Sequence, residues 1–258
     1  MIYVGTSGFS YDDWLGHFYP ENIRRGDMLR YYAQQFRAVE LNFTYYRMPN
    51  ATTLGQMAAK TPEEFQFVVK ANSVMTHERE REPEVFQQFC DALEPLTSAG
   101  KFGCILAQFP YSFRPSEHSA GYIRYFREQI PELPVVVEFR NRDWAQQETL
   151  EMLSELNLGY CCVDEPNLRG LMPRLAVATS ETGYVRFHGR NAEQWWDHEE
   201  AWQRYDYLYS EDELREWVGK VETIAGKTHR TYVFFNNHYQ GKAALNASLF
   251  DELLGGTR

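Results

Sequence analysis

The chain has 258 residues, 43% of them hydrophobic and 24% charged, which is enough to form a sizeable core in one or two domains. No apolar stretch approaches the roughly 20 residues that a membrane-spanning helix needs, and the first residues lack the basic and apolar segments of a secretory signal, so we expect a cytoplasmic protein with no membrane partner. The net charge of −10 argues against a surface that is basic all over and so disfavours nucleic acid as a partner.

Short apolar segments recur along the chain, with helical patterns between most of them. The expected strands are residues 2–6, 38–43, 65–71, 102–109, 134–139, 158–164, 183–189 and 230–236. The expected helices are residues 27–36, 83–96, 121–130, 147–156, 211–224 and 243–254. Strands that alternate with helices pair in parallel, because each connection has to cross back over the sheet.

Eight such units in a chain of about 250 residues are typical of a (β/α)8 TIM barrel. We therefore predict an α/β fold, with a single TIM-barrel domain over residues 1–258. The alternative is a doubly wound open sheet, but GTSGFS after the first strand lacks the G-x-G-x-x-G spacing of its dinucleotide-binding form. Pro and Gly interrupt residues 165–182, so we expect the sixth outer helix to be short or missing.

Polar residues end seven of the eight expected strands, at alternating positions that share one face. Barrel strands are buried on both faces, and the active sites of this fold lie at its carboxyl-terminal mouth. We predict a ligand or catalytic site there, with these side chains pointing inward: Glu40, Asn42, Lys70, Asn72, Gln108, Glu138, Arg140, Asp164, Arg186, His188, Asn236 and His238. The opposite face should pack against outer helices through Leu41, Phe139, Val163, Phe187 and Phe235.

Several cations stand out at this mouth in an otherwise acidic protein: Lys70, Arg140, Arg186 and Arg190. Arginine presents a planar fork that suits carboxylate or phosphate. The last strand leads into a helix at Gly241 and Lys242, where free backbone N–H groups attract anions. We therefore expect a small anionic substrate, phosphate-bearing for preference. The alternative is that the arginines only neutralise carboxylates of the same mouth.

Four side chains are candidates for acid–base catalysis: Glu138, His188, Asp164 and Glu40. His188 shares a face with Arg186, and a nearby cation should lower the pKa of a histidine, so that neutral His188 would act as a base near pH 7. A divalent metal held by the four is an alternative that the arginines disfavour, so no cofactor is expected. Further candidates for substrate binding are Asn42, His77, Trp144, Asn236, Asn237 and Tyr207.

The longest connection, residues 189–214, is rich in aromatic side chains: Trp195, Trp196, Trp202, Tyr205, Tyr207 and Tyr209. Long loops in compact domains are often lids or binding loops, and aromatic faces stack on bases or sugars. For half of these rings we expect only packing of the loop onto the barrel.

Six motifs occur in order along the chain: GTSGFSYDDW, VELNFTYYRMP, KANSVMTHE, VEFRNRDW, YVRFHGRN and FFNNHYQGKAALNA. Together they resemble the YecE-like family, a bacterial and archaeal domain of unknown function, over nearly the whole chain. The resemblance implies a TIM barrel and supplies no established reaction. The residues that correspond to the family's pattern are Glu40, Thr76, His77, Glu138, Arg140, Trp144, Asp164, Arg186, His188, Asn236 and Asn237.

These features favour an enzyme that acts on a phosphorylated or otherwise anionic substrate, as a hydrolase, a lyase or an isomerase. Glu138 or His188 would be the general base. Arg140, Arg186 and Lys70 would clamp the anion and stabilise developing negative charge. Two alternatives stay open, namely a nucleic-acid-binding or repair-related protein whose aromatic loop stacks bases, and a non-catalytic small-molecule sensor.

Overall fold

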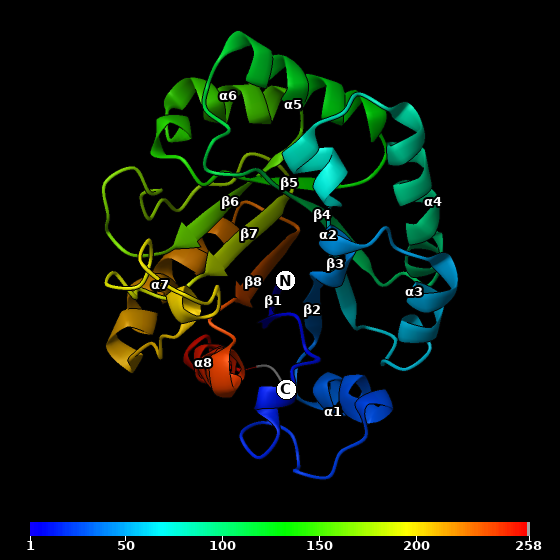
Figure 1. Ribbon diagram of the computed structural model, residues 1–258, viewed down its shortest axis with the longest axis vertical. Coiled ribbons are helices and arrows are strands. Elements are labelled where there is room, and N and C mark those ends of the chain that lie inside the picture. Colours follow the sequence, from blue (N-terminus) through cyan, green and yellow to red (C-terminus); the bar gives the residue numbers. More distant parts are fainter. Residues whose placement is uncertain (257–258) are drawn as a thin grey trace.

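The computed structural model describes residues 1–256, so the last two residues of the predicted domain lie outside the described residues. Eight parallel strands form a closed barrel in the order of the chain, and β1 pairs with β8 to close it. Helices surround the barrel (Figure 1). The predicted TIM barrel is therefore confirmed.

The element boundaries follow the apolar segments of the sequence closely. The strands are β1 (Ile2–Ser7), β2 (Ala38–Leu41), β3 (Gln66–Lys70), β4 (Phe102–Gln108), β5 (Val135–Glu138), β6 (Gly159–Asp164), β7 (Thr182–Phe187) and β8 (Arg230–Phe235). The α-helices are α1 (Met28–Gln35), α2 (Phe43–Tyr46), α3 (Ala51–Ala58), α4 (Pro83–Ser98), α5 (Glu117–Gln129), α6 (Gln147–Glu155), α7 (Glu211–Ala225) and α8 (Lys242–Leu253). Within residues 1–256, no helix has the length and apolar character needed to cross a membrane.

Two connections depart from a regular alternation of strand and helix. Residues 165–181, between β6 and β7, form no helix. This confirms the prediction that the outer helix after the sixth strand is short or missing. Between β2 and β3 the chain forms α2 and α3, which the apolar pattern did not reveal. The eight residues of α3 bury only Leu54 and Ala58, and its start depends on Asn50, whose side chain accepts a hydrogen bond from the N–H of Thr53.

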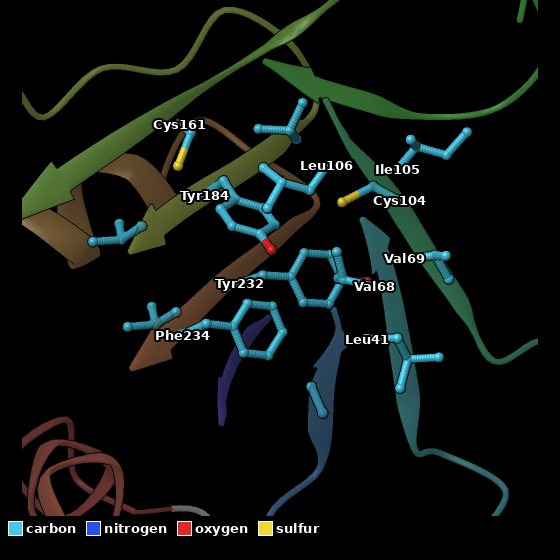
Figure 2. Packing of buried hydrophobic residues seen from close by; sticks show 14 of the residues in the cluster. Leu41, Val68, Val69, Cys104, Ile105, Leu106, Cys161, Tyr184, Tyr232 and Phe234 are labelled. Atoms are coloured by element: carbon cyan, nitrogen blue, oxygen red, sulfur yellow. The ribbon is translucent and has the colours of Figure 1, made fainter. Parts of the chain in front are cut away.

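Side chains fill the interior of the barrel. Tyr184 and Tyr232 point inward from β7 and β8 towards Leu106 of β4 (Figure 2). The two tyrosine rings lie 6.3 Å apart, and both residues are fully buried. The hydroxyl of Tyr184 donates a hydrogen bond of 2.7 Å to Glu40, so the packed core directly supports the polar groups at the mouth.

The alternation of side chains in β6 differs from the prediction. Cys161 points into the barrel (Figure 2), so Val163 shares its inner face and Asp164 lies on the outer one. Asp164 accepts a hydrogen bond of 2.7 Å from the indole N–H of Trp217 on α7. The prediction that Asp164 points into the barrel is therefore wrong. Cys161 and Cys162 are adjacent and both suit burial, so the sequence pattern alone does not decide which of them faces inward.

Candidate active site

Five side chains from β2, β5, β7 and the residues that follow these strands form a connected ion-pair cluster. We call it the mouth network: Glu40, Glu138, Arg140, Arg186 and His188. Arg186 lies at its centre, with Nη1 2.6 Å from Glu138 Oε2 and Nη2 2.7 Å from Glu40 Oε1. Arg186 is 1% exposed and both glutamates are fully buried. Arg186 therefore contributes to the charge compensation of both buried carboxylates.

Glu138 receives three positively charged or hydrogen-bonding groups. Its Oε1 lies 2.7 Å from Arg140 Nε and 3.1 Å from His188 Nε2, and its Oε2 faces Arg186. Burial alone would raise the pKa of Glu138, but the charges of Arg140 and Arg186 outweigh burial and hold the pKa well below its usual value of 4.5. Glu138 is therefore a carboxylate near neutral pH, and it fixes the positions of its three neighbours.

The hydrogen bonds of His188 define its tautomer. A carboxylate only accepts, so Nε2 donates to Glu138, and Nδ1 accepts from the side-chain amide of Asn236 at 3.1 Å. Burial and the charge of Arg140 lower the pKa of His188 to about 3, although Glu138 opposes this shift. His188 is thus neutral, and its pKa is lowered, as expected beside a cation. Both of its ring nitrogens, however, already form hydrogen bonds within the protein.

Lys70, the last residue of β3, and His77, in the turn that follows, contact the same ring. Lys70 Nζ lies 4.5 Å from the centroid of Tyr45, and His77 packs edge-on against that ring at 4.9 Å. Burial and the charge of Arg186 lower the pKa of Lys70 to about 7. Burial and the charge of Lys70 lower the pKa of His77 to about 4. His77 belongs to a π-helical turn over Val74–Glu78, a distortion that is frequent at functional sites.

A cavity of about 190 Å³ opens beside Arg140. Its lining includes Gln108, Tyr111, Arg140, Trp196, Arg204 and Tyr205. Arg140 forms an ion pair with Glu138, with Nε 2.7 Å from Oε1, but this buried Nε has no hydrogen-bond partner among residues 1–256. No hydrogen bond joins its two terminal nitrogens to the described residues either. Trp196 is 53% exposed and meets the ring of Tyr111 edge-on at 5.3 Å. The loop of residues 189–214 therefore lines part of this cavity.

Glu165, the first residue after β6, was not predicted as a site residue. It is 1% exposed, and its Oε1 accepts a hydrogen bond of 2.7 Å from the N–H of Met172. Its Oε2 is buried and has no hydrogen-bond partner among the described residues. Burial raises the pKa of Glu165 to about 7, although the charge of Arg140 opposes the rise. The correct alternation in β6 would have revealed it, because an outward Asp164 makes the next residue point inward.

A second cluster, the outer network, forms outside the barrel: Asp164, Arg174, Arg190, Tyr209 and Trp217. Arg190 binds Asp164 through two hydrogen bonds of 2.9 and 2.8 Å, and the Tyr209 hydroxyl donates to the same carboxylate at 2.8 Å. Tyr207 donates to Glu213 at 2.6 Å beside this cluster. The structure therefore does not bring Asp164, Arg190 or Tyr207 to the mouth network. Arg190 pairs with a carboxylate of the protein itself, as the alternative to an anionic substrate predicted.

Two other predicted binding residues, Trp144 and Asn237, form local hydrogen bonds. The indole N–H of Trp144 donates to the carbonyl of Phe113 at 2.7 Å, and the residue is buried. Asn237 is fully buried and donates to Asn246 at 2.9 Å. Neither reaches the mouth network. Asn42, at the start of α2, has a buried Oδ1 with no hydrogen-bond partner in the described part of the chain.

The carboxylates and imidazoles do not form a metal-binding group. Arg186 stands between Glu40 and Glu138, and Asp164 lies on the other face of the barrel wall. Within residues 1–256, no three or more His, Cys, Asp and Glu side chains are placed to hold a metal ion. At the start of α8, Lys242 forms an ion pair with Asp206, so its charge is already compensated.

Neutral His188 should make the protein less stable in mild acid. Its pKa is about 3 in the folded protein, against about 6.5 in an unfolded chain, so unfolding takes up a proton. The stabilisation is complete above pH 6.5 and is lost as the pH falls towards 3. Between pH 7 and pH 5, the free energy of unfolding should fall more steeply for the wild type than for His188→Gln, by about 1 kcal/mol per pH unit below the unfolded-state pKa.

Urea unfolding at several pH values measures this difference, and titrating groups that do not contact His188 cancel between the two proteins. His118 on α5 is exposed, so His118→Gln is the matched control and should keep the wild-type slope. Equal slopes for the wild type and His188→Gln would show that His188 is not held neutral by the fold.

The similarity to known proteins extends over nearly the whole chain. Residues 3–258 match a family model described as "Protein of unknown function DUF72". The chain is 33% identical over 270 residues to the UPF0759 protein YunF of Bacillus subtilis, covering 98% of this chain and 95% of that protein. A solved DUF72 structure from Thermotoga maritima has a TM-score of 0.92 and 42% identity, covering 99% of both chains. One from Enterococcus faecalis has a TM-score of 0.89 and 28% identity, covering 99% of this chain and 96% of that one. The chain therefore belongs to the DUF72 family of proteins of unknown function.

Proposed function

We propose that the protein is an enzyme that acts on a small anionic molecule, phosphate-bearing for preference, at the carboxyl-terminal mouth of the barrel. The observation that carries this proposal is the state of Arg140. It is ion-paired through Nε with Glu138 and lines the cavity, while none of its guanidinium nitrogens has a hydrogen-bond partner among the described residues. A guanidinium held in this way offers two parallel donors to a phosphate or carboxylate. Arg204 lines the same cavity and adds positive charge.

In this proposal Glu138 and His188 position other groups. A carboxylate with a pKa far below neutrality is a weak proton acceptor, and His188 has no free ring nitrogen. Glu165 is better suited to acid–base work, because its pKa of about 7 lets it donate or accept a proton near neutral pH. Its unpartnered oxygen and its electrostatic coupling to Arg140 favour a place beside the bound anion.

Three motifs of the YecE-like resemblance supply the mouth network. VELNFTYYRMP carries Glu40, VEFRNRDW carries Glu138 and Arg140, and YVRFHGRN carries Arg186 and His188. We infer that the YecE-like and DUF72 descriptions refer to one family that shares this site.

Thermal unfolding in the presence of anions tests the proposal. The panel contains inorganic phosphate, sugar phosphates, nucleotides and small keto acids. A ligand at a hundred times its dissociation constant adds about 2.7 kcal/mol to the free energy of unfolding. For a chain of this size, the midpoint should rise by roughly 5–10 °C. Arg140→Gln should remove most of the shift, because the anion loses the guanidinium that binds it. Arg186 and His188 still contact Glu138 in this variant.

Arg142→Gln is the matched control, because Arg142 is an exposed arginine two residues away and should leave the shift intact. Ligands found in this way are then incubated with the protein and followed by NMR. If the wild-type protein binds a ligand without converting it, the protein is a small-molecule sensor and the proposed enzyme activity is rejected. No midpoint shift with any anion would reject the anionic substrate.

A further inference from the structure

Lys101 and Lys70 are both withdrawn from full solvent exposure, and their hydrogen bonding differs. Lys101 is 7% exposed and donates to Ala58 O at 2.7 Å, to Thr61 O at 2.8 Å and to Thr61 Oγ1 at 3.2 Å. All three of its protons are therefore used, as expected of a structural ammonium group. Lys70 is partly accessible at the mouth, and its Nζ makes no hydrogen bond or ion pair with any of residues 1–256.

The nearby carboxylates are already engaged. Arg186 and Tyr184 occupy the two oxygens of Glu40. Glu138 is occupied by Arg140, Arg186 and His188. The mouth network thus leaves no carboxylate to hold Lys70 as an ammonium ion, and the contact of Nζ is with the face of the Tyr45 ring.

The two arginines near Lys70 lower its pKa, as burial does. Arg186 and Arg140 both disfavour a third positive charge at this position, and together with burial they outweigh Glu138 and Glu40. A large share of Lys70 is therefore a neutral amine near pH 7. Desolvation beside other cations is a recognised way to make a lysine nucleophilic.

We propose that Lys70 is a covalent nucleophile that forms an imine with an anionic aldehyde or ketone. The neutral amine adds to the carbonyl carbon, a C–N bond forms, and the carbonyl electron pair moves to oxygen. That oxygen takes one proton from the amine and one from solvent and leaves as water, while the nitrogen becomes a protonated imine. The anionic part of the substrate rests on the proposed function, in which Arg140 holds the anion.

Borohydride reduction of the wild-type protein tests this step, because it converts an imine into a stable secondary amine of known added mass. The probes are glyoxylate, pyruvate, dihydroxyacetone phosphate and glyceraldehyde 3-phosphate, with neutral dihydroxyacetone and glyceraldehyde beside them. Peptide mapping assigns the adduct among the chain's six lysines. We expect at least one anionic probe to label Lys70 at least tenfold more than any other lysine.

Lys101→Arg should keep this labelling, whereas Lys70→Arg should abolish it with its fold checked by circular dichroism. Equal labelling of Lys70 by anionic and neutral carbonyls would support the nucleophile and reject the anion site. Anions that shift the unfolding midpoint without any adduct at Lys70 would overturn the nucleophile and leave the proposed function standing. Labelling spread evenly over exposed lysines would also overturn it.

Discussion

The Arg186→Met variant is expected to be about 3–5 kcal/mol less stable than the wild type. Methionine removes the guanidinium that lies between Glu40 and Glu138, so buried Glu40 loses its cationic partner and buried Glu138 keeps only Arg140. Its volume fits the space, so the loss reports on charge and hydrogen bonds more than on packing. Urea unfolding at neutral pH, followed by tryptophan fluorescence, measures the difference, and the thermal midpoint should fall by about 10 °C.

Arg215→Met is the matched control for this loss. Arg215 pairs with Glu211 on the surface of α7, and both side chains are more than half exposed. Water and salt screen such a pair, so the control should lose less than about 0.5 kcal/mol. If Arg186→Met also loses less than about 1 kcal/mol, the two glutamates are not buried as charged groups and the mouth network has been misassigned.

Asp164→Asn is expected to lose about 3 kcal/mol of stability. The carboxylate accepts from Arg190, Tyr209 and Trp217, and an amide replaces one accepting oxygen with a donor that faces these donors. Anion binding at the mouth should be unchanged, because Asp164 lies on the outer face of β6. Chemical unfolding and the anion-induced midpoint shift are measured on the same variant.

Glu216→Gln serves as the control, since Glu216 contacts Arg190 from a side chain that is 49% exposed and should matter little. Loss of anion binding in a folded Asp164→Asn protein would mean that the outer network and the mouth act together. Such a result would return Asp164 to the candidate catalytic residues.

The barrel was predictable because its strands are apolar almost to their ends. Glu40, Lys70, Glu138 and Arg186 follow buried residues directly, and strand alternation placed all four at the mouth. The helix α3 was not predictable, because eight residues that bury two side chains carry too short a pattern to separate from a loop.

Residue partners were harder to predict than residue positions. Alternation brings Arg186 and Arg140 to the mouth. It does not show which of the two donates its hydrogen bonds to carboxylates of the protein itself. The structure separates them, with Arg186 fully enclosed and Arg140 at the cavity. In β6, two adjacent small and buried residues, Cys161 and Cys162, leave the alternation ambiguous. That ambiguity hid Glu165 and misplaced Asp164.

The long spans of the mouth network bear on how the chain is made. The bond from Arg186 to Glu40 joins residues 146 apart, and that to Ser7 joins residues 179 apart. During synthesis, Glu40 leaves the ribosome with no partner until β7 has followed it. Burying Glu40 before Arg186 is present would leave a carboxylate in the interior without its cation, which is costly. Closure of the barrel by β8 on β1 therefore comes after the partner that Glu40 needs has been made.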